Sequence, residues 1–320
     1  MDGDHKANAG FDAEREVFEP VGIDLRIASA HTEEEIIEAG LDADALLGFS
    51  ARVTRNVVYG LRRCRIIARY SVGFDSTDLE AATERGIIVT NVPDYCVSEV
   101  SAHTLALILA AARNLKGYDR DIRRGQWDPL SVPLQRLERG TLALLGFGRI
   151  AREVARKASV FGMRILAHDP FLPEGEILSL GATPVDLDTL LREADFLSLH
   201  APLAPGALHL LGTRELALMK PRAWLINTAR GGLVSEGALV DALRNRRLAG
   251  ACLDAFEEEP IAPKSDLLEL DNVILSPHAA WYSEEARYER NRKAAVAVAT
   301  ALTGGIPRNV VNPTVLSRLR

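Results

Sequence analysis

The chain has 320 residues, 47% of them hydrophobic and 26% charged, which favours two globular domains and excludes a disordered protein. Its formal net charge of −6 argues against a general nucleic-acid-binding protein, because such proteins present a basic surface. The longest apolar segment, 104–112, is too short to cross a bilayer, and residues 1–10 contain no apolar signal-peptide core.

Three cysteines, Cys64, Cys96 and Cys252, lie far apart in the sequence and form no C-x-x-C pair. This usage is typical of reduced, buried thiols in a cytoplasmic protein. We expect no metal site and no membrane or nucleic-acid partner.

Residues 1–97 show the pattern of a small α/β unit. The predicted strands are 25–28, 45–49, 65–68 and 87–90, and the predicted helices are 32–39 and 79–85. A flavodoxin-like domain normally starts with an apolar strand, yet residues 1–10 contain none. Either the chain starts late or the domain lacks its first strand, so we expect a weakened or rearranged sheet at this end.

A long apolar helix, 98–115, is predicted to connect this unit to a second one. From Thr141 onward short apolar runs alternate with helical patterns. The runs are 142–145, 163–167, 196–199, 223–226, 251–253 and 273–275, and the helices are 150–160, 187–194, 213–219 and 236–246. Such runs are typical of strands buried on both faces, and their alternation with helices predicts a doubly wound parallel sheet. A helix, 284–303, and an extended tail, 304–315, follow.

The first of these runs leads into a turn of the form G-x-G-x-x-A, made by Gly146, Gly148 and Ala151. Gly146 permits the tight turn, Gly148 lets the backbone approach a pyrophosphate, and Ala151 lets the helix pack closely on the strand. The phosphates of a dinucleotide would then lie on free N–H groups at the start of the helix. The motif alone is weak evidence, because many unrelated enzymes contain it.

Asp169 follows the next apolar run, about twenty residues after the glycines, where a carboxylate binds both ribose hydroxyls of the adenosine. A carboxylate there repels the 2′-phosphate of NADP, and no arginine follows it directly. We therefore expect NAD (NADH) to be preferred over NADP. The alternative is a turn-forming Asp-Pro dipeptide with Pro170.

Three further strand ends carry an arginine, an acidic run and a histidine, namely Arg230, 257–259 and His278. Each has a structural alternative: a surface arginine, a solvated acidic loop or a structural histidine. Together they supply what the reduction of a 2-oxo acid needs. A histidine protonates the oxyanion, a carboxylate orients the imidazole and raises its pKa, and an arginine binds the substrate carboxylate.

Over nearly its whole length, from Val21 to Pro313, the chain resembles the D-isomer-specific 2-hydroxyacid dehydrogenases. The motifs that carry the resemblance are GFGRIA at 146–151 with Asp169, LHAPL at 199–203, NTARGGLV at 227–234, LDAFEEEP at 253–260 and SPHAAWYSEE at 276–285. The last motif, with GGIPRNVVNP at 304–313, is most similar to the C-terminal-binding-protein branch. The chain departs from the family at 99–102, which reads E-V-S-A instead of S-V-A-E, and at Ser71, where glycine is common.

The resemblance implies that Arg230, Glu259 and His278 form the catalytic trio, with Glu259 directly before Pro260. The cofactor site that it implies comprises Thr104, Gly146, Phe147, Gly148, Arg149, Ile150, Asp169, His200, Ala201, Pro202, Thr228, Ala229, Asp254 and Ala280. Within this set, Asp254 would bind the nicotinamide carboxamide. The implied substrate residues are Ser71, Val72 and Gly73, whose N–H groups would hold the carboxylate, together with Arg69 and Trp281. Arg69 either faces the substrate or has a surface role.

The expected fold is α/β with two Rossmann-like domains. A doubly wound parallel-sheet NAD domain, 100–284, is inserted into a smaller flavodoxin-like substrate domain, 1–99 and 285–320. The expected activity is NAD-dependent interconversion of a small D-2-hydroxy acid and its 2-oxo acid. By family resemblance we expect a homodimer that pairs through the NAD domain, with 113–127 as a candidate arm. The alternatives are an NAD(H)-sensing corepressor-like scaffold and an enzyme that oxidises a non-carbon acid such as phosphite.

Overall fold

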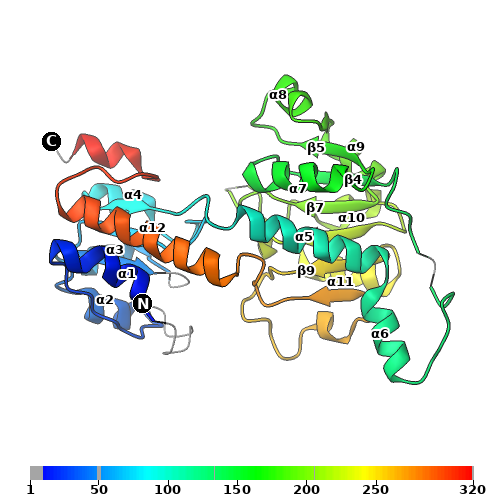
Figure 1. The fold of residues 1–320 in the computed structure, drawn as a ribbon, viewed down its shortest axis with the longest axis horizontal. Helices are drawn as coiled ribbons and strands as arrows, with labels where there is room; N and C mark the ends of the chain where they lie inside the picture. Colours follow the sequence, from blue (N-terminus) through cyan, green and yellow to red (C-terminus); the bar gives the residue numbers. More distant parts are fainter. Residues whose placement is uncertain (1–9, 49–51, 133, 205, 319–320) are drawn as a thin grey trace. The chain divides into compact units, whose positions relative to one another are not determined.

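The computed structural model describes residues 10–48, 52–132, 134–204 and 206–318. The chain forms two compact units, one from Met1–Cys96 with Ser283–Arg320 and the other from Val97–Tyr282 (Figure 1). It leaves the first unit after Cys96 and returns to it after Tyr282. The second unit is therefore one continuous segment, whereas the first is assembled from two segments that are far apart in the sequence.

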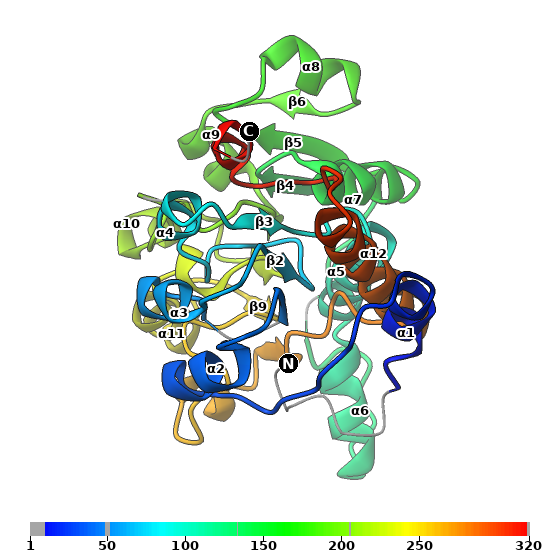
Figure 2. The ribbon, with the colours of Figure 1, turned by 90° about the vertical axis from the view of Figure 1, so that its left-hand side faces the viewer.

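The first unit contains a three-stranded parallel sheet in the order β1-β2-β3. Its strands are Ala45–Gly48, Ile66–Arg69 and Ile88–Thr90. Helices α2, α3 and α4 cover one face, while α12 with α1 covers the other (Figure 2). These helices are α1 Asp12–Phe18, α2 Glu33–Gly40, α3 Arg55–Gly60, α4 Leu79–Glu84 and α12 Glu284–Leu302.

This sheet has fewer strands than predicted, because residues 25–28 form none. No strand of the described residues pairs with this segment, and Ile27 in it is 52% exposed. An alternating apolar pattern forms a strand only where a partner completes its hydrogen bonds and a layer covers its apolar face. Two parts of the prediction for this end of the sheet lie outside the described residues: residues 1–9, and Phe49, the last residue of a predicted strand.

The second unit contains a seven-stranded parallel sheet in the order β10-β9-β8-β7-β4-β5-β6. Its strands are β4 Thr141–Leu145, β5 Arg164–His168, β6 Thr183–Pro184, β7 Phe196–Leu199, β8 Trp224–Asn227, β9 Gly250–Leu253 and β10 Val273–Leu275. This order confirms the predicted doubly wound sheet. The direction of winding reverses between β4 and β7, and ligands of such sheets bind at that point, beyond the carboxyl ends of the strands.

Two apolar cores lie on the two faces of this sheet. Alternate residues of β4 point to opposite sides, with Ala143 and Leu145 in one core and Leu142 and Leu144 in the other. The first core contains residues of α9 Leu187–Glu193, α10 Thr213–Leu218 and α11 Glu236–Arg244. The second contains residues of α5 Val97–Ala112 and α7 Arg149–Ser159. Burial on both faces explains why the strands were predictable as continuous apolar runs.

Several local predictions differ from the structure. The predicted helix 98–115 ends at Ala112, because Asn114 adopts left-handed backbone angles (φ 47°), and a new helix, α6 Leu115–Arg123, begins after it. The short β6 and the helix α8 Glu174–Ser179 were not predicted. The predicted extended tail pairs once, at Val310 with Thr90, and then forms a 3₁₀ helix, Pro313–Ser317. Among the described residues, no helix combines the length and apolarity needed to cross a membrane.

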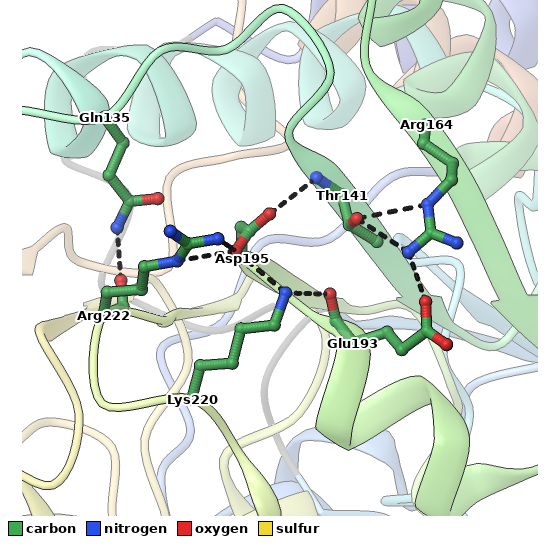
Figure 3. A network of polar contacts seen from close by, with 7 residues as sticks. All are labelled: Gln135, Thr141, Arg164, Glu193, Asp195, Lys220 and Arg222. Atoms are coloured by element: carbon green, nitrogen blue, oxygen red, sulfur yellow. Dashed lines mark hydrogen bonds and ion pairs between the residues drawn. The ribbon is translucent and has the colours of Figure 1, made fainter.

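A polar network joins residues at or near the amino ends of β4, β5, β7 and β8 (Figure 3). Its centre is Asp195, which is 5% exposed and directly precedes β7. The backbone N–H of Thr141 donates to Asp195 Oδ2 at 2.9 Å, and Lys220 Nζ and Arg222 Nη2 each lie 3.0 Å from Oδ1. The network also includes Gln135, Arg164 and Glu193. It lies at the opposite edge of the sheet from the predicted cofactor site.

Candidate active site

The glycine turn between β4 and α7 has the geometry that its sequence predicts. Gly146 has a φ of +86°, and a Cβ atom there would lie 2.8 Å from the carbonyl of His200, so only glycine fits. Gly148 directly precedes α7, and a Cβ atom there would meet nothing within 4 Å. The backbone is thus tightly packed behind Gly146 and open to a ligand at Gly148.

Asp169 is held beside this turn at the end of β5. Its Oδ2 accepts a hydrogen bond from the backbone N–H of Phe147 at 2.9 Å, and its Oδ1 accepts one from Phe171 at 2.9 Å. The Phe147 side chain is fully buried, so this residue can face the site only through its backbone. The two N–H groups fix the carboxylate in position, and each oxygen retains further acceptor capacity.

These residues fit a dinucleotide. The N–H groups of the first turn of α7 have no partner within the helix, and the open space at Gly148 allows a phosphate to approach them. Asp169 supplies an acceptor for hydroxyl groups at the adjacent strand end. Burial lowers the pKa of His200, at the end of β7, to about 4, so its imidazole is neutral and adds no positive charge at pH 7.

Arg230 lies in a turn that follows β8. Hydrogen bonds with Asn227 and close packing against the backbone of Phe256 hold this turn in place. The buried Asn227 accepts from the N–H of Ala229 at 3.0 Å and donates to the carbonyl of Arg230 at 2.9 Å. A Cβ atom on Gly231 would lie 1.8 Å from the carbonyl carbon of Phe256. The turn of Arg230 therefore packs directly on the backbone of the loop that carries the predicted acid.

His278 and Glu259 form a hydrogen-bonded pair. Nδ1 of His278 lies 2.8 Å and 3.0 Å from the two carboxylate oxygens of Glu259, and the Phe256 N–H donates to Oε1 at 3.0 Å. Nδ1 therefore carries the proton, because an ionised carboxylate can only accept. The other ring nitrogen, Nε2, has no hydrogen-bond partner within the described residues, and the side chain is 41% exposed. A histidine in this arrangement can exchange a proton with a bound ligand.

The charges around this pair shift both pKa values. The hydrogen bond to Glu259 raises the pKa of His278 despite partial burial, and the charge of Asp254 adds to the increase. Burial opposes ionisation of Glu259, but the hydrogen bond and charge of His278 outweigh it and lower the pKa of Glu259. The positive charge of Arg230 acts on both groups and lowers both pKa values. The predicted trio is thus electrostatically coupled within the second unit.

Asp254 supports the turn that carries His278. It is 1% exposed, and its oxygens accept from the N–H groups of Ala279 and Ala280, each at 2.9 Å, and from the Ser276 hydroxyl at 2.6 Å. His278, between these residues, has a φ of +51°, which is unfavourable for a side chain other than glycine. Three hydrogen bonds to one buried carboxylate hold this backbone in place. The family resemblance implies a cofactor role for Asp254, but nothing in the sequence indicates this bracing role.

The remaining predicted residues of the second unit differ in exposure. Thr104 is completely buried, and its Oγ1 lies 3.1 Å from Oγ1 of Thr228. Trp281 is 9% exposed and makes an edge contact with Tyr282. His103, beside Thr104 on α5, lies 3.0 Å from the Ser276 hydroxyl and was not predicted to take part. Its only signal in the sequence is its position next to a residue of the cofactor motif.

The predicted substrate loop lies in the first unit, directly after β2. The hydroxyl of Ser71 donates to the carbonyl of Gly73 at 2.6 Å and closes the loop locally. Arg69 is only 2% exposed, and its Nη2 donates to Ser76 Oγ at 2.9 Å. The alternative of a surface role for Arg69 is therefore wrong. Arg69 is buried because it lies on β2, the central strand of the sheet, where side chains are covered on both faces.

Comparison with known proteins places this geometry in context. Residues 105–280 match the family model described as "D-isomer specific 2-hydroxyacid dehydrogenase, NAD binding domain". The chain is 42% identical over 299 residues to a D-3-phosphoglycerate dehydrogenase of Methanocaldococcus jannaschii, covering 92% of this chain but only 56% of that protein. It is 41% identical over 290 residues to a glyoxylate reductase of Korarchaeum cryptofilum, covering 89% of this chain and 87% of that protein.

A solved structure gives a similar result for the fold. The crystal structure of a D-lactate dehydrogenase from Aquifex aeolicus, complexed with NAD and lactic acid, matches with a TM-score of 0.85 and 31% identity. The match covers 93% of this chain and 95% of that one. The match therefore includes residues of both units, whereas the phosphoglycerate dehydrogenase is almost twice as long as the matched region.

Proposed function

Because this chain belongs to the D-isomer specific 2-hydroxyacid dehydrogenase family, we propose that it interconverts a small D-2-hydroxy acid and its 2-oxo acid with NAD as the redox partner. The observation that carries the proposal is the His278–Glu259 pair, whose charges are coupled to Arg230. An acid–base group, its carboxylate partner and a carboxylate-binding cation are the set that this reaction requires.

Each member of the trio has one role in the proposed reduction. The guanidinium of Arg230 binds the substrate carboxylate through parallel N–H groups. Nε2 of His278 donates a proton to the carbonyl oxygen as it becomes an alkoxide. Glu259 holds the imidazole through Nδ1 and stabilises its protonated form. When bound, NADH supplies the hydride for the carbonyl carbon.

We propose that the cofactor is NAD rather than NADP. The support is the position of Asp169, whose carboxylate is fixed at the strand end where adenosine hydroxyls bind in this fold. A second negative charge, such as a 2′-phosphate, would be repelled there. Arg149, Ile150, Ala201, Pro202, Thr228, Ala229 and Ala280 complete the proposed cofactor site.

The proposed substrate is a short 2-oxo acid. Two relatives named glyoxylate reductase are each 41% identical to this chain, so glyoxylate is the first compound to test. Ser71, Val72 and Gly73 are proposed to hold the carboxylate through backbone N–H groups, and Trp281 to form an apolar wall. Arg69 is proposed to face a polar group of the substrate.

The test is NADH oxidation by the purified protein against glyoxylate, hydroxypyruvate, oxaloacetate, pyruvate and 2-oxo acids with bulky side chains. We expect turnover with at least one short acid and a higher kcat/KM with NADH than with NADPH. Equal activity with both cofactors would contradict the role of Asp169. NADH-dependent capture of a protein partner without any turnover would instead support the corepressor-like alternative.

We also propose a homodimer that pairs through the second unit. The segment after α6 exposes two large apolar side chains, Trp127 (87%) and Leu130 (86%). Exposed groups of this size in one segment are typical of an interface between subunits. Sedimentation equilibrium should give twice the mass of the chain, and Trp127→Ser should weaken the association. A wild-type monomer at micromolar concentration would exclude this arrangement.

A further inference from the structure

Two adjacent side chains of α5, His103 and Thr104, contact two turns of the proposed active site. His103 Nε2 lies 3.0 Å from Oγ of Ser276, which precedes His278 by two residues. Thr104 Oγ1 lies 3.1 Å from Oγ1 of Thr228, which precedes Arg230 by two residues. One short stretch of one helix therefore touches the turn of the acid–base residue and the turn of the carboxylate-binding residue.

The contact of His103 is part of a chain of hydrogen bonds. The Ser276 hydroxyl donates to Asp254 Oδ1 at 2.6 Å, and the same oxygen accepts from the Ala279 N–H at 2.9 Å. Asp254 thus binds the turn of His278 on both sides of that residue. Its carboxylate is 1% exposed, so its hydrogen bonds must come from within the protein.

The directions of these hydrogen bonds follow from the number of protons. A serine hydroxyl has one proton, and that of Ser276 goes to the carboxylate of Asp254. Oγ of Ser276 must then accept from His103, so Nε2 of His103 carries a proton. The same nitrogen lies 3.7 Å from Asp254 Oδ1, and the side chain is 28% exposed. His103 therefore orients the hydroxyl and faces the buried carboxylate.

We propose that His103 is a positioning residue for the reaction, because its Nε2–H directs the Ser276 hydroxyl onto Asp254 and so fixes the 276–280 turn. The proposal rests on the proposed function, since positioning matters only if His278 transfers a proton. His278 needs such support because its φ of +51° is unfavourable for a residue that has a Cβ atom. His103 touches neither substrate nor reacting atoms in this role.

The experiment compares His103→Phe, which keeps a ring but lacks the donor, with His103→Gln, which keeps an N–H donor. The matched control is His31→Phe, because His31 makes a similar bond to a serine, Ser29, at 3.1 Å in the first unit. We expect His103→Phe to lower kcat about tenfold, as a displaced acid–base group should. The Kd for NADH should stay within about twofold, and His103→Gln should recover most of kcat. His31→Phe should behave as wild type.

A second measurement needs no turnover. Amide hydrogen exchange of residues 276–282 should become faster in His103→Phe and remain slow in His103→Gln and His31→Phe. Unchanged exchange and unchanged kcat in His103→Phe would overturn the proposal. A loss of kcat that His103→Gln fails to restore would also overturn it, because His103 would then act through packing. A Kd for NADH that rises as much as kcat falls would overturn it as well.

The two proposals can fail separately. If the wild-type protein reduces no 2-oxo acid, the proposed function fails while hydrogen exchange still decides whether His103 fixes the turn. If wild type is active and His103→Phe has both wild-type kcat and wild-type exchange, only the role of His103 is refuted.

Discussion

In the seven-stranded sheet, charged groups gather both at the amino ends of the strands (the amino edge) and at their carboxyl ends (the carboxyl edge). The two groups differ in their burial and in whether their hydrogen bonds are satisfied within the protein. At the amino edge, Asp195 is 5% exposed and is surrounded by Lys220, Arg222 and the N–H of Thr141 (Figure 3). At the carboxyl edge, His278 and Glu259 are 41% and 38% exposed, and Nε2 of His278 has no partner among the described residues. Charge density alone therefore does not mark a site. Unused hydrogen-bonding capacity at the carboxyl ends of the strands does.

The largest effect that this comparison predicts is a loss of activity at the carboxyl edge. His278→Ala removes the proton donor, and we expect kcat to fall by about 10²–10⁴-fold. The Kd for NADH should change little, because the glycine turn and Asp169 are untouched. Stopped-flow turnover and fluorescence titration with NADH measure the two quantities. A variant with full turnover would show that the open histidine is not the acid–base group.

The amino edge should respond in stability instead of activity. Asp195→Ala leaves two cations and one N–H without their acceptor, and we expect a loss of about 2–3 kcal/mol in the free energy of unfolding of the second unit. All three tryptophans lie in this unit, so tryptophan fluorescence in urea reports its unfolding. The kcat of the folded variant should equal that of wild type.

The matched control for this variant is Asp266→Ala. Its partner is Arg244, and the two side chains are 56% and 44% exposed, so the loss should be below about 1 kcal/mol. Equal losses in the two variants would contradict the importance of burial at the amino edge. If kcat of Asp195→Ala fell under conditions in which the protein is fully folded, the amino edge would affect activity as well as stability, which would contradict the comparison.

A smaller effect is expected from the carboxylate that supports His278. Glu259→Gln keeps the shape but removes the charge that raises the pKa of His278, so that pKa should fall. Reduction requires protonated His278, and kcat/KM in wild type should decline as pH rises through the raised pKa. In Glu259→Gln the decline should begin at lower pH, with a loss of about tenfold at pH 7.

The same pair makes stability depend on pH. A raised pKa of His278 stabilises the folded protein fully below the pKa of the unfolded chain, and this contribution disappears as pH rises through the folded-state value. The lowered pKa of Glu259 contributes above its unfolded value and is lost as pH falls. If kcat/KM depended on pH in Glu259→Gln as it does in wild type, Glu259 would not control the protonation of His278.

The last prediction concerns the two glycines of the turn, which should respond differently to substitution. Gly148→Ala has room for its Cβ and an ordinary φ of −75°, so folding should not change, but NADH affinity should fall about tenfold, or 1.4 kcal/mol. Gly146→Ala should instead destabilise the second unit, because its Cβ would collide with His200. Calorimetric titration and urea unfolding distinguish these outcomes. Equal affinity in Gly148→Ala and wild type would contradict a close phosphate approach.

The sequence predicted the second unit better than the first. Strands buried on both faces appear as continuous apolar runs, and β4, β7 and β9 were found in this way. Residues 25–28 have the composition of a strand but lack a partner, and pairing is not encoded in a single segment. The break of the helix at Asn114 depends on one left-handed residue, which asparagine permits but does not require.

The same distinction holds for the site. Arg230, Glu259 and His278 could be proposed because each follows a predicted strand, and parallel strands end at one edge. The bracing by Asp254, Ser276 and His103 joins segments far apart in sequence through hydrogen bonds whose distances only coordinates supply. Bracing residues carry no chemical signature of their own, since a buried carboxylate, a serine and a histidine occur in many structural roles.

The split composition of the first unit has a consequence for synthesis on the ribosome. Helix α12, which packs on α1, β1 and β2, is translated only after all residues of the second unit. The N-terminal segment of the first unit therefore has one face of its sheet uncovered while residues 97–282 complete their own core. A released chain truncated after Tyr282 should thus carry a protease-resistant second unit and a first unit that is still open to cleavage.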